Sequence, residues 1–127
     1  MNTTKRIILI DDEEVITFGF AQYLREPGIE IDCMNTFNDA RQAIATGSYD
    51  AAVVDLRLSD STEPEGLFCV ELLRAHQSQC KIIVLTAYGD SLLREQAKAR
   101  GADLFLEKPI EPQKLMEVLS SFGIYSS

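Results

Sequence analysis

The sequence predicts an α/β fold, in which a single-domain (βα)5 chain forms a doubly wound parallel sheet. Short apolar runs rich in β-branched residues alternate along the chain with longer segments whose apolar residues recur every three or four positions. The connections are long enough for helices, and crossovers of helical length join strands that run parallel. Right-handed crossovers of this kind place helices on both faces of the sheet.

The strands are expected where apolar runs are bounded by polar or turn-forming residues. The run RIILI and the later run KIIVL have no polar residue between their first residue and their end, which is typical of parallel strands covered on both faces. The expected strands are Arg6–Ile10, Ile29–Met34, Ala51–Val54, Lys81–Leu85 and Asp103–Leu106.

The helices are expected where apolar residues share one face of a helix. Pro27 and Gly28, Gly47, and Gly101 stand where three of these segments end. The expected helices are Glu13–Arg25, a second that opens at Asn38 or Asp39 and ends at Gly47, Gly66–Ala75, Leu92–Arg100 and Glu111–Phe122. Their expected core residues are Ile16, Phe20, Tyr23, Leu24, Ala40, Ile44, Ala45, Leu67, Cys69, Val70, Leu73, Leu115, Val118 and Leu119.

Composition limits the functions that the chain can have. The 127 residues suit one domain, and 20 acidic against 12 basic residues give a net charge of −8, which opposes direct binding of nucleic acid. No apolar run approaches the ~20 residues that span a bilayer, and no signal peptide precedes the first strand, so we expect a cytoplasmic protein without membrane contact. The three cysteines are too widely spaced for a zinc site or a disulfide scaffold.

Polar residues follow four of the five expected strands. Asp11 and Asp12 follow the first strand, Asp55 the third, Thr86 the fourth and Lys108 the fifth. The carboxyl ends of parallel strands share one edge of a sheet, where open α/β folds bind ligands. We therefore expect these five side chains to meet in one cleft.

Each of these residues also has an ordinary structural interpretation. Asp11 with Glu14 could form a helix capping box, Asp55 could cap a turn, and Thr86 and Lys108 could be strand-end and loop residues. Four such coincidences at four strand ends are much less probable than any one of them, so the pattern favours a functional site.

Electrostatics indicates what such a site would need. Two carboxylates about 4 Å apart repel by roughly 4 kcal/mol at an effective dielectric constant of 20. Lys108 supplies one positive charge, and Mg²⁺, a hard ion that takes oxygen ligands, would supply two more. A metal, a lysine and a nucleophilic aspartate together suit phosphoryl transfer to a carboxylate.

Four motifs give the chain a family resemblance. They are IDDEE after the first strand, VVDL at the third, LTAYG at the fourth and FLEKP at the fifth. In these motifs the chain resembles the response-regulator receiver domains of two-component signalling, over Lys5–Phe122 within a single domain of residues 1–127. The resemblance implies the strand order 2-1-3-4-5. It also implies a sensor histidine kinase or a histidine phosphotransfer protein as partner, with Mg²⁺ as cofactor and possible phosphorylation-dependent dimers.

The resemblance also implies a role for each matching residue. Asp55 is expected to take the phosphoryl group, and Lys108 is expected to pair with the phosphoryl oxygens. Asp12 is expected to bind Mg²⁺ directly and Asp11 through water, while Asp55 and the backbone carbonyl of Arg57 complete the protein ligands. Thr86 and Phe105 are expected to form the switch. The domain would assist its own phosphorylation and dephosphorylation without being a turnover enzyme.

The chain departs from the family pattern after Asp55. Ser59 stands where receivers usually carry proline, and the stretch 58–65 is about three residues longer than usual. Arg57 and Tyr88 occupy positions that flank the path of attacking water in this family, and their bulk leads us to expect slow dephosphorylation.

Three other functions remain as alternatives. A degenerate receiver would act as a phosphorylation-independent binding module, but it would lack one of Asp55, Thr86 or Lys108. A phosphatase of the haloacid-dehalogenase type needs DxD after the first strand, and a flavodoxin-like electron carrier needs a phosphate-binding loop there, whereas this chain has the acidic sequence IDDEE.

Val15 and Phe18 could form an exposed docking surface near the site, or Phe18 could tuck under a neighbouring helix. Whether the domain stands alone or belongs to a hybrid kinase or a transcription factor is left open.

Overall fold

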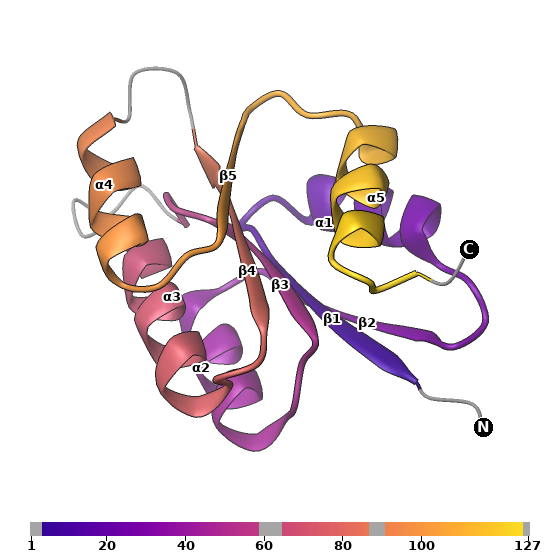
Figure 1. The fold of residues 1–127 in the computed structure, drawn as a ribbon, viewed down its shortest axis with the longest axis horizontal. Coiled ribbons are helices and arrows are strands. Elements are labelled where there is room, and N and C mark those ends of the chain that lie inside the picture. The colour runs from indigo at the N-terminus through magenta and orange to yellow at the C-terminus, as the bar shows by residue number, and fades with distance from the viewer. Residues whose placement is uncertain (1–3, 59–64, 87–90, 126–127) are drawn as a thin grey trace.

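A computed structural model describes residues 4–58, 65–86 and 91–125, and it shows the predicted α/β fold. Five strands form a parallel sheet in the order β2-β1-β3-β4-β5 (Figure 1). The strands are β1 (Lys5–Ile10), β2 (Ile29–Met34), β3 (Ala51–Asp55), β4 (Lys81–Thr86) and β5 (Leu104–Glu107). The helices are α1 (Glu14–Leu24), α2 (Phe37–Thr46), α3 (Glu65–His76), α4 (Ser91–Ala99) and α5 (Pro112–Ser121).

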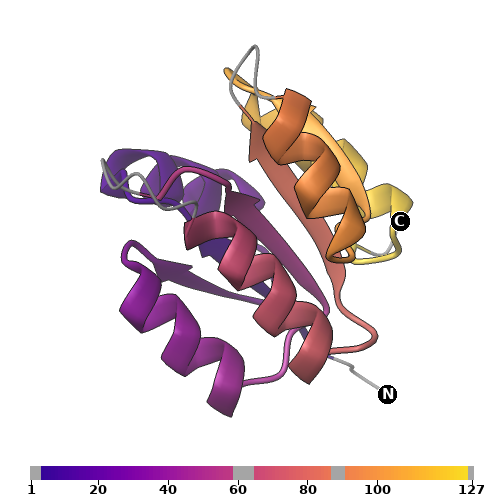
Figure 2. The same cartoon turned by 90° about the vertical axis from the view of Figure 1, so that its left-hand side faces the viewer.

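Helices cover both faces of the sheet. Helices α2, α3 and α4 pack on one face, and α1 and α5 pack on the other (Figure 2). Alternate residues of each central strand point into the two cores, so that Ile8 packs toward α2 and α3 while Ile7 and Leu9 pack toward α1 and α5. Within the described parts of the chain, no helix is both long and apolar enough to cross a bilayer.

The ends of the expected elements agree with the structure to within two residues, but three details differ from the prediction. On α1 the buried residues are Thr17, Phe20, Ala21 and Leu24, whereas Tyr23 is 46% exposed. The buried set has the spacing i, i+3, i+4, i+7 of one helix face, and Tyr23 lies beside that face. Small Ala21 occupies the core position that the pattern of large apolar residues assigned to Tyr23.

The start of α2 also differs from the prediction. The helix begins at Phe37, because the Thr36 side chain accepts a hydrogen bond of 3.1 Å from the backbone N–H of Asp39 and so caps the helix. Asp39 therefore lies in the first helical turn, where its negative charge interacts favourably with the helix dipole. Ala45, expected in the core, is exposed.

The start of α3 packs against the backbone that follows β3. The N–H of Gly66 donates a hydrogen bond of 3.2 Å to the carbonyl of Leu56, and a Cβ on Gly66 would overlap backbone atoms of Asp55 and Leu56. Only glycine allows this approach without moving the backbone. The close contact fixes the position of the chain directly after Asp55.

Substitution of Gly66 by alanine should therefore destabilise the protein. We expect the free energy of unfolding to fall by about 3 kcal/mol, since backbone atoms cannot yield as a side chain would. Urea denaturation measures this change. Gly19→Ala is the matched control, because Gly19 lies inside α1 with no described atom within 4 Å of an added Cβ, and alanine there should raise stability by about 0.5–1 kcal/mol. Equal effects of the two substitutions would contradict the close packing.

Candidate functional site

Residues at the carboxyl ends of β1, β3 and β5 meet at one edge of the sheet. Carboxylate oxygens of Asp11, Asp12 and Asp55 all lie within 4.8 Å of one another. Lys108 Nζ donates to Asp55 Oδ2 at 2.9 Å and to Asp11 Oδ2 at 3.2 Å. Strands β1 and β3 are neighbours in the sheet, and this order brings the first two aspartates beside the third.

Each buried aspartate uses its two oxygens differently. Oδ1 of Asp11 accepts from the N–H of Glu13 at 3.0 Å, and Oδ1 of Asp55 accepts from the N–H of Arg57 at 3.1 Å. These local bonds are turns of the kind that aspartate often forms. The other oxygen of each aspartate contacts Lys108, so the turns orient both carboxylates toward the lysine.

The capping box that was the structural alternative for Asp11 and Glu14 is absent. The N-cap of α1 is Glu13, and its side chain makes no capping hydrogen bond. Instead, Oδ1 of Asp11 accepts a hydrogen bond from the backbone N–H of Glu13, and Oδ2 accepts one from Lys108.

The three carboxylates differ in their exposure to solvent. Asp11 and Asp55 are 3% and 7% exposed, whereas Asp12 lies at the surface. Burial raises the pKa of Asp55, although the hydrogen bond and charge of Lys108 oppose that rise. Partial burial and the nearby Asp11 carboxylate raise the pKa of Asp12. The cluster therefore favours additional positive charge.

Lys108 is a cation at neutral pH. Burial by itself would lower the pKa of this lysine, but the hydrogen bonds and charges of Asp55 and Asp11 outweigh burial and raise it. One positive charge faces three carboxylates, so the site retains an excess of negative charge on the side where Asp12 is exposed.

The three carboxylates fit a hard divalent cation. Mg²⁺ prefers oxygen ligands and binds through a few carboxylates with water completing its shell. Asp11, Asp12 and Asp55 offer such oxygens close together, and the exposure of Asp12 leaves the ion a path from solvent. The donor set therefore suits Mg²⁺ better than a softer metal that prefers sulfur or imidazole ligands.

The structure places the expected switch residues on the side of the sheet that α4 covers. Thr86 ends β4 and is 1% exposed, and Phe105 of β5 is half-buried and packs against the core formed with α2 and α3. In the register of these strands Phe105 pairs with Val84, two residues before Thr86. The two residues are thus close in the sheet.

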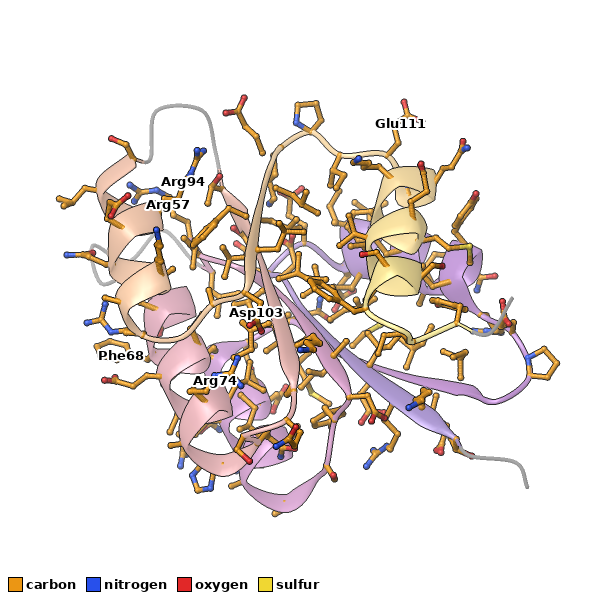
Figure 3. The ribbon with its side chains drawn as sticks, in the orientation of Figure 1. Arg57, Phe68, Arg74, Arg94, Asp103 and Glu111 are labelled. Carbon is orange, nitrogen blue, oxygen red and sulfur yellow. The ribbon has the colours of Figure 1, made fainter. Side chains whose placement is uncertain are left out.

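Sequence reasoning missed Arg94. Its Nη2 donates to Thr86 Oγ1 at 3.3 Å and lies 3.7 Å from Glu107 Oε2. Figure 3 shows Arg94 and Arg57 on the α4 side of the molecule, toward the end of the sheet where β4 ends. The helical spacing of the sequence marks Arg94 as a surface position of α4, and no local signal points back to Thr86.

Several expectations fall outside the described residues. Tyr88 and residues 59–64 of the lengthened stretch belong to the parts that the structure does not describe. The expected metal contact through the carbonyl of Arg57 stays a prediction. The backbone N–H of Arg57 does contact the site, because it donates a hydrogen bond to Asp55 Oδ1.

Helix α1 presents apolar side chains next to the site. Val15 and Phe18 are 73% and 64% exposed, so Phe18 does not tuck under a neighbouring helix. They line a groove of ≈ 640 Å³ between α1 and β2, together with Ala21 and Cys33. A second hollow of ≈ 330 Å³ includes apolar residues of α1 and Lys108 itself.

A family model of the response regulator receiver domain matches residues 7–120. The chain belongs to this family. This receiver domain is 36% identical over 118 residues to the photosynthetic apparatus regulatory protein RegA of Rhodovulum sulfidophilum, covering 92% of the chain and 62% of RegA. It is 31% identical to the transcriptional regulatory protein GltR of Pseudomonas aeruginosa, covering 88% of the chain and 46% of GltR. The domain thus spans less than two thirds of the length of these relatives.

Solved structures of receiver domains have the same fold. A CheY-like receiver domain protein from Methanospirillum hungatei JF-1 superposes with a TM-score of 0.85 at 26% identity, covering 94% of this chain and 93% of that one. A response regulator from Burkholderia pseudomallei, described with a phosphorylated aspartic acid, a calcium ion and citrate, has a TM-score of 0.79 at 26% identity, covering 92% and 72%.

Removal of one carboxylate should stabilise the metal-free receiver domain. A carboxyl group whose pKa is raised on folding destabilises the fold once it ionises, and this is the direction found for Asp12. We expect Asp12→Asn to raise the free energy of unfolding by about 1 kcal/mol in EDTA at pH 7, a value reduced for the exposure of Asp12. Denaturant unfolding with EDTA measures it.

The same variant should lose its response to Mg²⁺. A ligand that binds only the folded state stabilises it in proportion to the logarithm of its concentration, so Mg²⁺ should raise the thermal midpoint of the wild type but not of Asp12→Asn. Glu30→Gln, which removes an exposed charge from the edge strand β2, should respond like the wild type. An undiminished response to Mg²⁺ in Asp12→Asn would contradict the metal site.

Proposed function

We propose that this receiver domain accepts a phosphoryl group on Asp55 from a phosphohistidine of a partner protein, in a reaction that depends on Mg²⁺. The observation that carries the proposal is the pair of hydrogen bonds from Lys108 Nζ to Asp55 and Asp11, with Asp12 beside them. A nucleophilic carboxylate, a fixed cation and oxygen ligands for a metal are the parts that phosphoryl transfer to aspartate requires.

The chemical step exchanges one bond to phosphorus for another. A carboxylate oxygen of Asp55 attacks the phosphorus atom, the P–N bond breaks, and the imidazole of the partner leaves with the electron pair. The turn at Arg57 and the bond to Lys108 hold the Asp55 carboxylate in one orientation before attack. Lys108 then pairs with the phosphoryl oxygens and offsets their charge.

The acidic residues would hold the metal during this step. Asp11, Asp12, Asp55 and the carbonyl of Arg57 would bind Mg²⁺, whose charge neutralises phosphoryl oxygens when it is bound. The Burkholderia relative supports this assignment, since its structure is described with both a phosphorylated aspartic acid and a divalent ion. We propose that the domain is not a turnover enzyme, because the phosphoryl group stays on its own side chain.

Phosphorylation would change the conformation at Thr86 and Phe105. It adds about −1.5 to −2 charge and three acceptor oxygens at Asp55. The hydroxyl of Thr86 can donate to such an oxygen, and Phe105 can follow it inward because it already packs at the edge of the core. Since the phosphoryl group favours one arrangement of these residues over the other, the population shifts toward that arrangement.

The partner that supplies the phosphoryl group would dock on α1. Val15 and Phe18 are exposed on α1 and line a groove beside β2, and a separate hollow lined by Ile16 and Phe20 of the same helix includes Lys108. A sensor histidine kinase or a histidine phosphotransfer protein must bring its phosphohistidine to this edge of the sheet. We place the domain in the cytoplasm, where it would control a partner or an output domain, with phosphorylation-dependent dimers as one form of output.

Phosphorylation by a small donor tests the chemistry directly. Incubation with acetyl phosphate or phosphoramidate and Mg²⁺ should add the mass of one phosphoryl group to the intact protein, and EDTA should prevent the addition. Asp55→Asn should not gain this mass, because the amide is not a nucleophile at this site, whereas Asp39→Asn should behave as the wild type. Absence of phosphorylation in the wild type would favour the alternative of a receiver that binds its partner independently of phosphorylation.

Docking on α1 has a separate test. Phe18→Ala should slow phosphotransfer from a histidine kinase that phosphorylates the wild type by about tenfold, because an exposed aromatic residue at the centre of an interface often contributes strongly to binding. Phosphorylation by acetyl phosphate should be unchanged. Leu92→Ala is the control, since Leu92 is 72% exposed but belongs to α4. Equal slowing by both substitutions would argue against a docking surface on α1.

A further inference from the structure

Arg94 connects helix α4 to the ends of two strands. Its Nη2 donates to the hydroxyl of Thr86 at 3.3 Å and lies 3.7 Å from a carboxylate oxygen of Glu107. Arg94 is labelled in Figure 3. Thr86 ends β4 and Glu107 ends β5. One guanidinium group of α4 therefore contacts the ends of two neighbouring strands.

The contact to Thr86 is sheltered from solvent. Thr86 is 1% exposed, and Arg94 Nε is buried without a hydrogen-bond partner among residues 4–58, 65–86 and 91–125. Solvent therefore competes poorly for the Thr86 hydroxyl, and the burial of Nε shows that the arginine stem lies against the protein. The donor is charged, which makes the hydrogen bond stronger than one from a neutral donor at the same distance.

The same contact opposes the proposed switch. Val84 packs in the core that α2, α3 and α4 cover, and alternation along the strand places Thr86 on this face as well. Here the hydroxyl binds Arg94, while the hydrogen bonds of Lys108 Nζ go to Asp11 and Asp55. The proposed switch takes this hydroxyl to a phosphoryl oxygen on Asp55, so the hydrogen bond to Arg94 competes with the switch.

We propose that Arg94 is a positioning residue that holds Thr86 in the unphosphorylated arrangement and so sets how readily the domain switches. This inference rests on the proposed function of Asp55 and Thr86. Glu107 contributes by anchoring the guanidinium, and it directly precedes Lys108, so Arg94 also ties α4 to the strand end that carries the lysine. Loss of Arg94 removes a bond that only the unphosphorylated arrangement makes, and the equilibrium moves toward the activated arrangement.

The size of the effect follows from the geometry. The bond is long at 3.3 Å and the Arg94 side chain is 39% exposed, so its contribution belongs at the low end for charged donors. We expect Arg94→Ala to bind a phosphoryl mimic about three- to tenfold more tightly than the wild type. Glu107→Gln should shift binding in the same direction by a smaller factor.

Titration with beryllofluoride in Mg²⁺ tests this inference. Beryllofluoride attaches to a carboxylate in the place of a phosphoryl group, and NMR of the Thr86 and Phe105 signals reports both its binding and the switch. Lys98→Ala is the matched control, because it removes one positive charge from an exposed position one turn further along α4 and should leave the affinity unchanged. Arg94→Gln, which keeps most of the aliphatic stem, provides a second variant if the alanine variant unfolds.

A double substitution distinguishes positioning from a general effect on the fold. Thr86→Val removes the hydroxyl and keeps the shape of the side chain, so Arg94→Ala should have no further effect on beryllofluoride affinity in this background. A gain in affinity that persists with Thr86→Val overturns the inference, as does unchanged or weaker binding by both Arg94 variants. Wild-type protein that takes no beryllofluoride would overturn the proposed function itself, and the inference with it.

Discussion

The hydrogen bonds of one lysine support the whole site. Lys108 contacts Asp55 and Asp11, which lie 53 and 97 positions away in the sequence, and it offsets part of their mutual repulsion. Without a cation between them, two carboxylates that are 3% and 7% exposed would oppose folding of the sheet edge that carries them. The rest of the edge depends on this pairing, because the turns at Asp11 and Asp55 leave one oxygen of each aspartate directed at the lysine.

The site combines rigid and adjustable parts. Asp55 is held by a turn, by Lys108 and by the close approach of Gly66 to the backbone behind it, so the proposed nucleophile would need little ordering before it reacts. Thr86 is held instead by one hydrogen bond from a partly exposed arginine of a neighbouring helix. Weak restraint of Thr86 suits the proposed switch, since a small difference in free energy would then change its position.

Much of the fold and the residues of the site could be predicted from the sequence. Strand and helix positions were recognisable from hydrophobic periodicity, and polar residues after four strands predicted the edge at which they meet. Tyr23 was wrongly assigned to the core because periodicity does not tell a large residue beside the buried face from a small one, Ala21, within it. The role of Thr36 as the cap of α2 was missed because the neighbouring Asn38 and Asp39 are equally common at helix starts.

The residue types at the strand ends and the alternation of strands with helices were properties of the sequence alone, because short-range patterns encode them. The tertiary structure decided which oxygen of each aspartate meets Lys108, which carboxylate remains exposed, and that Arg94 reaches Thr86 from another element. Such contacts depend on how helices and strands pack against one another. Local spacing specifies the face on which a side chain lies, but not the distant group that it finds there.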